Sequence, residues 1–138
     1  YTLLHFVFGG RGIHRVRDQA YPVQAGQAFL IRPGEMTSYS ADLQDPWHYG
    51  WIGFDGSLAA RFSELPPVFP LPEEIMASIH AALQDPHVTE YRLAGQLLRL
   101  YEHLFTGSTN RNRHVRQVEN YIRLSYMHPI RVEMIARQ

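Results

Sequence analysis

The first seventy residues alternate short apolar and aromatic runs with turn-forming residues. The runs lie at residues 1–8, 12–23, 27–32, 35–41 and 47–54, and Gly or Pro stands at most of their boundaries. Runs of this length between such boundaries are typical of β-strands. The segment 12–23 predicts a hairpin with its turn at Asp18 and Gln19. Short strands so closely spaced predict a small barrel or jelly roll.

After residue 70 the spacing of apolar residues becomes helical. One helix is predicted from Glu73, with two Glu in its first turn where the helix dipole favours them, and a second over residues 89–105. The second carries two adjacent apolar stripes, Leu93, Leu97, Leu100 and Leu104, and Ala94, Leu98, Tyr101 and Phe105. An arc this wide can bury one side in its own domain and offer the other to a partner, or bury both.

A polar linker over 106–112 precedes a third predicted helix at 114–129, and a fourth is predicted to begin at residue 130. Strands therefore come first and helices after, which predicts an α+β architecture.

Composition narrows the class of protein. The chain has 138 residues, no Cys, and 13 acidic residues balanced by 13 basic ones, all of them Arg. Disulfides and thiolate metal sites are excluded, and a neutral chain lacks the charge expected of a nucleic-acid-binding surface. No apolar run reaches the length of a membrane span. We expect a cytoplasmic protein with no membrane partner, cut from a longer chain because it opens within a strand without an initiator Met.

The sequence shows little sign of catalytic or metal-binding motifs. The eight His show no HxxxH or HxH spacing, and His14 alone could reach a barrel interior. No Ser stands in a nucleophile elbow, and the Gly-rich segment 9–12 does not open a helix. We therefore predict no catalytic residues, no metal ligands and no cofactor.

The segment 38–56 concentrates the largest side chains, including both Trp of the chain. In a strand, Trp47, Tyr49 and Trp51 share one face, and His48, Gly50 and Ile52 share the other. This aromatic face fits ordinary core as well as the wall of a pocket for a hydroxyl-bearing ligand, and the residues alone leave both open.

Three segments together carry a family resemblance: YTLLHFVFGGRGIHR at 1–15, YPVQAGQAFLIRPGEMTSYSAD at 21–42 and DPWHYGWIGFDG at 45–56. They resemble the effector-binding domain of AraC/XylS-family transcription regulators. The resemblance implies a cupin-like barrel at 1–70, a helical pair for dimerisation at 71–108, and a linker with the start of a helix-turn-helix domain at 109–138. The recognition helix would lie beyond Gln138, so DNA would be bound only by the full-length protein.

The resemblance also implies which residues bind the effector. Tyr39, Tyr49 and Trp51 fall where sugar-responsive members contact their ligand, with Trp51 as the stacking platform. His5 and Arg32 are further candidates, and Trp47 either joins the site or caps the barrel. The implied effector is a sugar or glycoside, and the implied assembly is a homodimer through Leu93, Leu97, Leu100 and Leu104.

The sequence departs from metal-binding cupins in the same region. Their hairpin His pair is reduced to His14, Gln19 stands near the acidic position, and Thr37 occupies the place of the later His. The resemblance therefore predicts a metal-free, non-enzymatic barrel. Two alternatives stay open: a barrel that binds no small molecule and only dimerises, and a cupin-type enzyme.

Overall fold

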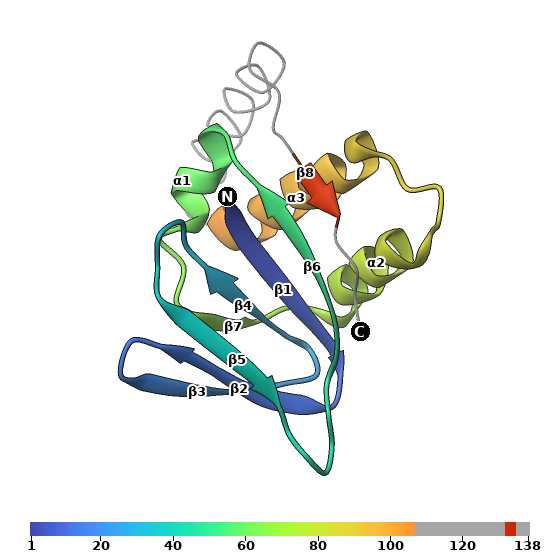
Figure 1. Ribbon diagram of the computed structural model, residues 1–138. Coiled ribbons are helices and arrows are strands. Elements are labelled where there is room, and N and C mark those ends of the chain that lie inside the picture. The colour runs from blue at the N-terminus through green and yellow to red at the C-terminus, as the bar shows by residue number, and fades with distance from the viewer. Residues whose placement is uncertain (107–131, 135–138) are drawn as a thin grey trace.

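A computed structural model describes residues 1–106 and 132–134 and contains two antiparallel sheets backed by helices (Figure 1). The larger sheet has the order β7-β4-β1-β6-β8, formed by Val68–Pro70, Gln27–Ile31, Thr2–Gly9, His48–Phe54 and Val132–Met134. The smaller sheet has the order β3-β2-β5, formed by Gln19–Gln24, Arg11–Val16 and Thr37–Ala41. The predicted α+β class is confirmed.

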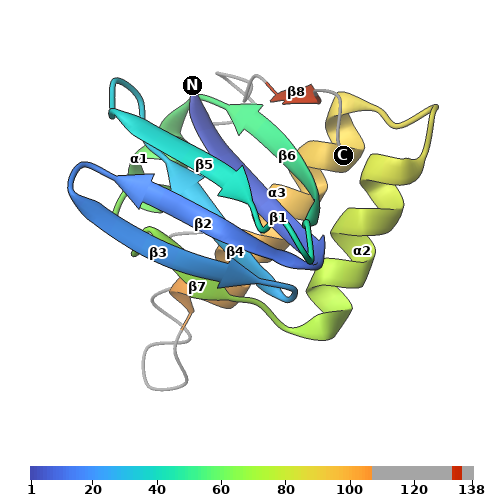
Figure 2. The same ribbon diagram turned by 60° about the horizontal axis from the view of Figure 1, so that its bottom comes forward.

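The helices cover one face of the larger sheet, and the smaller sheet lies over the other face (Figure 2). They are α1 (Ser57–Phe62), α2 (Glu73–Gln84) and α3 (Glu90–Phe105). The hydroxyl of Thr89 caps α3 by accepting a hydrogen bond from the backbone N–H of Arg92 at 3.1 Å. No helix in the described part of the chain is long and apolar enough to cross a membrane.

The main hydrophobic core lies between the larger sheet and the helices. The strands contribute side chains such as Leu4, Leu30 and Ile52, and α3 contributes Leu97 and Leu100, all almost wholly buried. Burial of this kind is the principal stabilising term for the fold. The core therefore fixes α2 and α3 against the sheet and leaves the opposite sheet face to pack on β2, β3 and β5.

Most of the predicted elements are present, with small shifts. The hairpin turn falls at Arg17 and Asp18 rather than at Asp18 and Gln19, because Arg17 adopts the left-handed conformation (φ 56°) and Gln19 already belongs to β3. The strand predicted at 27–32 ends one residue earlier, at Ile31. The short elements α1 and β7 were not predicted, since neither is long enough to show a periodic pattern.

The helix predicted from residue 130 is wrong where the structure describes it. Val132–Met134 form β8, which pairs with Phe54, Gly53 and Ile52 of β6. The outer edge of β6 presents backbone N–H and C=O groups that an added strand satisfies, and this outweighs helical spacing in so short a segment. The predicted third helix lies outside the described residues.

The leucine stripe of α3 faces its own domain. Leu93, Leu97 and Leu100 are at most 2% exposed, and Leu104 is partly buried against the same core. In the second stripe Tyr101 is also buried. Intramolecular packing, the alternative that the sequence left open, therefore accounts for these leucines within one chain.

Candidate functional site

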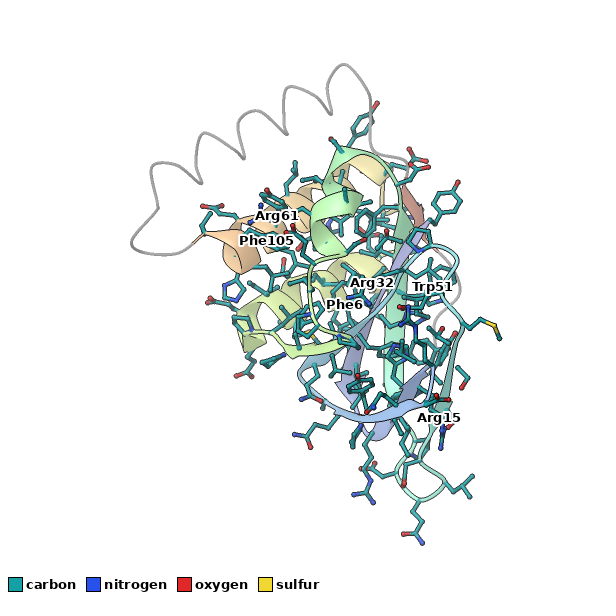
Figure 3. The ribbon with its side chains drawn as sticks, turned by 90° about the vertical axis from the view of Figure 1, so that its left-hand side faces the viewer. Phe6, Arg15, Arg32, Trp51, Arg61 and Phe105 are labelled. Atoms are coloured by element: carbon teal, nitrogen blue, oxygen red, sulfur yellow. The ribbon has the colours of Figure 1, made fainter. Side chains whose placement is uncertain are left out.

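The alternation of β6 directs its aromatic residues toward the smaller sheet. Trp51 and Tyr49 lie within ring contact of His5, at centroid distances of 5.7 Å each, whereas Ile52 points into the helix-side core. Figure 3 places Trp51 and Phe105 of α3 on opposite sides of the larger sheet. The shared face predicted for the aromatic residues of this strand is confirmed.

Two cross-strand rows face each other between the sheets. Phe29, His5 and Trp51 stand side by side in the larger sheet, since His5 pairs with Phe29 on β4 and with Trp51 on β6. Tyr39 stands beside His14 in the smaller sheet. The rows meet where Tyr39 contacts His5 at 4.9 Å and Phe29 at 5.5 Å. We call these five residues, together with Tyr49 and Trp47, the inter-sheet cluster.

Trp47 closes one end of this cluster. Its ring is stacked on Phe29 at 5.4 Å and meets Tyr49 edge-on at 5.8 Å, and the residue is almost wholly buried. The indole lies directly on Gly12 of β2, where an added Cβ would come within 2.4 Å of the ring. Only glycine leaves room for Trp47 at this position, so the two residues together define the end of the inter-sheet space.

Two imidazoles form the polar interior of the cluster. His5 is stacked on Phe29 at 4.5 Å and nearly parallel to it, and His14 contacts the same ring at 4.7 Å. Both are at most 1% exposed, and Nδ1 of each has no hydrogen-bond partner. Burial lowers the pKa of His5 to about 3, helped by the nearby His14, and burial also lowers the pKa of His14. The interior therefore carries neutral rings rather than charge.

The tyrosines lie nearer to solvent. Tyr39 is 39% exposed, and Tyr49 and Trp51 are half-buried. Burial, and after it the neighbouring Tyr39, raise the pKa of the Tyr49 phenol above its usual value. The cluster thus grades from a neutral, buried interior to an accessible aromatic rim with hydroxyl groups.

Arg32 is engaged elsewhere. Its Nε donates to the carbonyl of Ser63 at 2.9 Å, Nη2 donates to the carbonyl of Leu65 at 2.5 Å, and Nη1 approaches Glu35 at 3.5 Å. These bonds tie the end of β4 to the segment that follows α1. Of the six predicted ligand-binding residues, the structure brings together Tyr39, Tyr49, Trp51, Trp47 and His5, and uses Arg32 as a clamp.

The predicted ligand-binding residues did not include two members of the cluster, Phe29 and His14, although His14 was expected to be able to reach the barrel interior. Alternation along β2 puts His14 on the same face as Gly12 and Val16, and that signal was available in the sequence. The sequence could not show that β2 packs face to face against β1 and β4 of the other sheet. Within the described residues, no group of three or more His, Asp or Glu is arranged to hold a metal ion.

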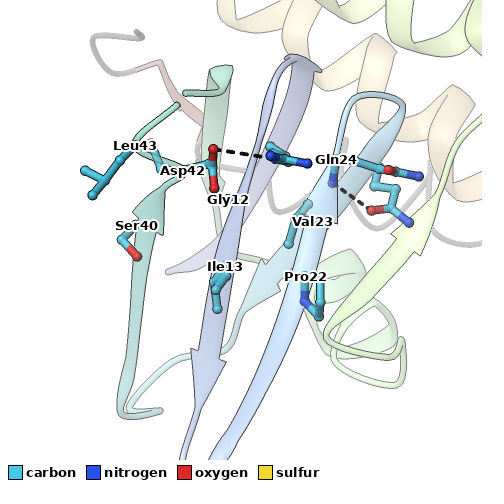
Figure 4. A pocket seen from close by; sticks show the side chains of 11 residues that line it. Gly12, Ile13, Pro22, Val23, Gln24, Ser40, Asp42 and Leu43 are labelled. Atoms are coloured by element: carbon cyan, nitrogen blue, oxygen red, sulfur yellow. Dashed lines mark hydrogen bonds and ion pairs between the residues drawn. The ribbon is translucent and has the colours of Figure 1, made fainter. Parts of the chain in front are cut away.

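A separate hollow of about 700 Å³ lies on the outer face of the smaller sheet (Figure 4). Ile13 and Pro22 form its apolar floor, and the Arg11–Asp42 ion pair, at 3.5 Å, lies on its rim. Because Ile13 and His14 are neighbours on one strand, this hollow and the inter-sheet cluster occupy opposite faces of β2. The hollow is therefore not part of the cluster.

Comparison with known proteins defines the class. The AraC-like ligand binding domain family matches residues 1–119, and the chain belongs to this family, which serves transcription regulation rather than catalysis. The chain is also 29% identical over 157 aligned positions to the Msm operon regulatory protein of Streptococcus mutans, covering 99% of this chain and 56% of that protein. It thus spans about half the length of that relative.

Two shorter matches point to the same class of regulator. A lactose operon transcription activator of Staphylococcus xylosus is 33% identical over 55 residues, covering 40% of this chain and 20% of that protein. A raffinose operon transcriptional regulatory protein of Pediococcus pentosaceus is 32% identical over 57 residues, covering 41% of this chain and 21% of that protein. The chain is a ligand-binding domain related to regulators of sugar operons.

Proposed function

We propose that this domain binds a sugar or glycoside between its two sheets and thereby controls DNA binding by a further domain of the full-length regulator. One observation carries the proposal: buried imidazoles and phenol-bearing rings fill a space that aliphatic side chains would fill at less cost. The operons named for the relatives support a carbohydrate effector. Aromatic faces bind the C–H surface of a pyranose, while phenols and imidazoles bind its hydroxyls.

Trp51 is the proposed stacking surface, with Tyr39 and Tyr49 as hydroxyl partners at the rim. The rings already touch one another, with centroids 4.9–6.0 Å apart between His5, Tyr39, Tyr49 and Trp51. An effector must therefore displace Tyr39 or Trp51 to enter. Such a displacement gives bound and free states different arrangements of β5 and β6, which is the differential binding that any switch requires.

A thermal-shift screen with neutral mono- and oligosaccharides, lactose and raffinose included, tests this function. A ligand at about 100 times its dissociation constant adds about 2.7 kcal/mol to the free energy of unfolding. We expect a hit with the native chain and none with Trp51→Ala. Met36→Ala is the control, because Met36 is 84% exposed and belongs neither to the inter-sheet cluster nor to α3. A hit that survives in Trp51→Ala would remove the stacking role.

A second candidate function is a barrel that binds no small molecule. The close ring contacts favour this second function, because closely packed rings are also typical of a hydrophobic core that has no room for a ligand. The same screen separates the two candidates: absence of any shift across sugars of all sizes would favour the closed barrel, and a Trp51-dependent shift would exclude it.

We further propose that the regulator is a homodimer whose contact runs along α3. The buried leucines cannot form it, so the exposed flank of the same helix must. Tyr91, which is 89% exposed, and Leu98, which packs at the edge of the helix-side core and is only partly buried, lie seven residues apart on that flank. We expect Tyr91→Asp combined with Leu98→Asp to convert dimer to monomer in light scattering, with Leu43→Asp as the exposed control. A double variant that stays dimeric would move the interface off α3.

A further inference from the structure

His14 is the most completely buried polar side chain of the inter-sheet cluster. It is 0% exposed, its ring lies 4.7 Å from Phe29, and it stands directly beside Tyr39 across β2 and β5. Its Nε2 lies 3.3 Å from the carbonyl oxygen of Leu30, on the opposite sheet. Its Nδ1 has no hydrogen-bond partner.

The Leu30 contact favours the tautomer that carries the proton on Nε2. A carbonyl oxygen only accepts, so Nε2 is the N–H donor in that contact, and a neutral imidazole in this tautomer has its lone pair on Nδ1. The carbonyl of Ser38 also acts on the ring, and Nδ1 has no hydrogen-bond partner. A buried acceptor left without a donor costs free energy, and such groups in a native fold call for an explanation. His5 presents a second buried, unpartnered Nδ1 across the same space. In this tautomer His14 lacks the partner that a donor-bearing ligand would supply, and His5 lies beside it with a second unpaired ring nitrogen.

The charged groups near His14 do not favour an anion. Arg32 and Glu35 are the charged residues whose fields reach the ring, and they are paired with each other at 3.5 Å. Both guanidinium nitrogens of Arg32 outside that pair are bonded to carbonyls of Ser63 and Leu65. The carbonyl of Ser38 also lies near the His14 ring. A carboxylate or phosphate entering here would meet lone pairs and, among the described residues near the ring, no unpaired cation.

We propose that His14, with His5, is the acceptor end of the effector site, and that the effector is a neutral molecule whose hydroxyl group donates to Nδ1 of His14. This inference rests on the proposed function and makes it specific. It adds His14 to the binding residues and excludes sugar acids and sugar phosphates as the preferred effectors. Trp51 and the tyrosines then contact the faces of the sugar ring, while the imidazoles hydrogen-bond to its hydroxyl groups and so distinguish one sugar from another.

Calorimetry on the native chain and two variants tests the assignment, with the neutral sugars galactose, lactose and raffinose and the acid galacturonate as probes. His14→Phe keeps a ring against Phe29 but removes the acceptor. We expect roughly 10- to 100-fold weaker binding of the neutral sugar, the range for a buried donor left unpaired. We expect galacturonate to bind more weakly than galactose. His80→Phe is the matched control, since His80 also packs on a phenylalanine, Phe8, at 4.4 Å but lies on α2.

The outcomes separate this inference from the function on which it rests. A neutral sugar that binds equally to the native chain and to His14→Phe overturns the role of His14 and leaves the sugar sensor standing. Preferred binding of galacturonate overturns the neutral-effector claim alone. Binding by none of the probes overturns both.

Nitrogen-15 NMR of the histidine rings gives a readout that does not depend on finding the ligand. We expect His14 in the free chain to be the Nε2–H form with an unprotonated Nδ1, and the Nδ1 resonance to move when the sugar binds. A protonated Nδ1 in the free chain would overturn the proposal even if the His14→Phe variant failed to fold.

Discussion

On its helix side the larger sheet carries Leu4, Leu30 and Ile52, whereas on its other side the same strands carry His5, Phe29 and Trp51. The first face meets mainly apolar side chains of the helices, such as Leu97 and Leu100, and these are almost wholly buried. The second meets His14 and Tyr39 and grades into solvent at its rim. Adjacent residues of one strand thus serve two different interiors, an apolar one beneath the helices and a mixed one in which Val7 and Val23 pack with Phe29 and Trp47 beside the imidazoles.

The difference separates what stabilises this domain from what it binds. Aliphatic side chains pack densely, so the helix-side core contributes stability, and Thr2 is the buried polar side chain that β1 places on that face. The inter-sheet cluster keeps two buried nitrogens without partners and exposes a phenol, a costly arrangement for a core. Sites that give up stability in this way are typical of function.

The largest effect is expected in the helix-side core. Leu100→Ala removes a wholly buried side chain and should lower the free energy of unfolding by about 2–5 kcal/mol, measured by urea denaturation. Sugar binding by the folded fraction should be unchanged. A loss below about 1 kcal/mol would show that this core is not the main source of stability.

The next effect is a pH dependence that belongs to the inter-sheet cluster. The pKa of His5 is about 3 in the folded chain and near 6.5 when unfolded, so the unfolded state takes up the proton first. Stability should be complete above pH 6.5 and fall as the pH drops toward 3, by about 1.4 kcal/mol per pH unit within that window. Denaturation at several pH values, with His5→Phe as comparison, checks this: the variant should have the shallower slope.

A smaller effect of opposite sign is expected from His5→Phe at neutral pH. Replacing a buried ring that has an unpaired nitrogen by an apolar ring of similar shape should raise the free energy of unfolding by about 1 kcal/mol. The same change should weaken sugar binding. If His5→Phe were less stable and still bound the sugar normally, the inter-sheet cluster would serve stability rather than binding.

The clamp formed by Arg32 should matter for stability rather than for binding. Arg32→Met removes the bonds to Ser63 and Leu65 and should cost about 1 kcal/mol, since the side chain is only partly buried. Thermal melts measure the cost, and calorimetry with the sugar found in the screen should give an unchanged affinity. A large loss of affinity would return Arg32 to the binding residues.

The smallest effect is expected on the outer hollow. Leu43 is 99% exposed at its rim, so Leu43→Ser should change stability by less than about 0.5 kcal/mol and leave sugar affinity unaltered. If this variant alone lost sugar binding, the effector site would lie on the outer face of the smaller sheet instead of between the sheets.

The sequence by itself determined the order of the elements and which residues of β6 lie on each face of the strand. Alternation in 47–54 needs no partner strand to place Trp51 and Ile52 on opposite faces, because the two-residue repeat is a property of the backbone. Helical spacing likewise located α2 and α3. The family resemblance pointed to Tyr39, Tyr49 and Trp51 before any strand was paired.

Tertiary structure decided the rest. The leucines of α3 are equally apolar whether they face a sheet or a second chain. Only the packed fold shows that they are buried within their own domain. Arg32 became a clamp because the segment after α1 brings the carbonyls of Ser63 and Leu65 within reach. His14 joined His5 because two sheets fold face to face, a contact between strands that no local pattern encodes.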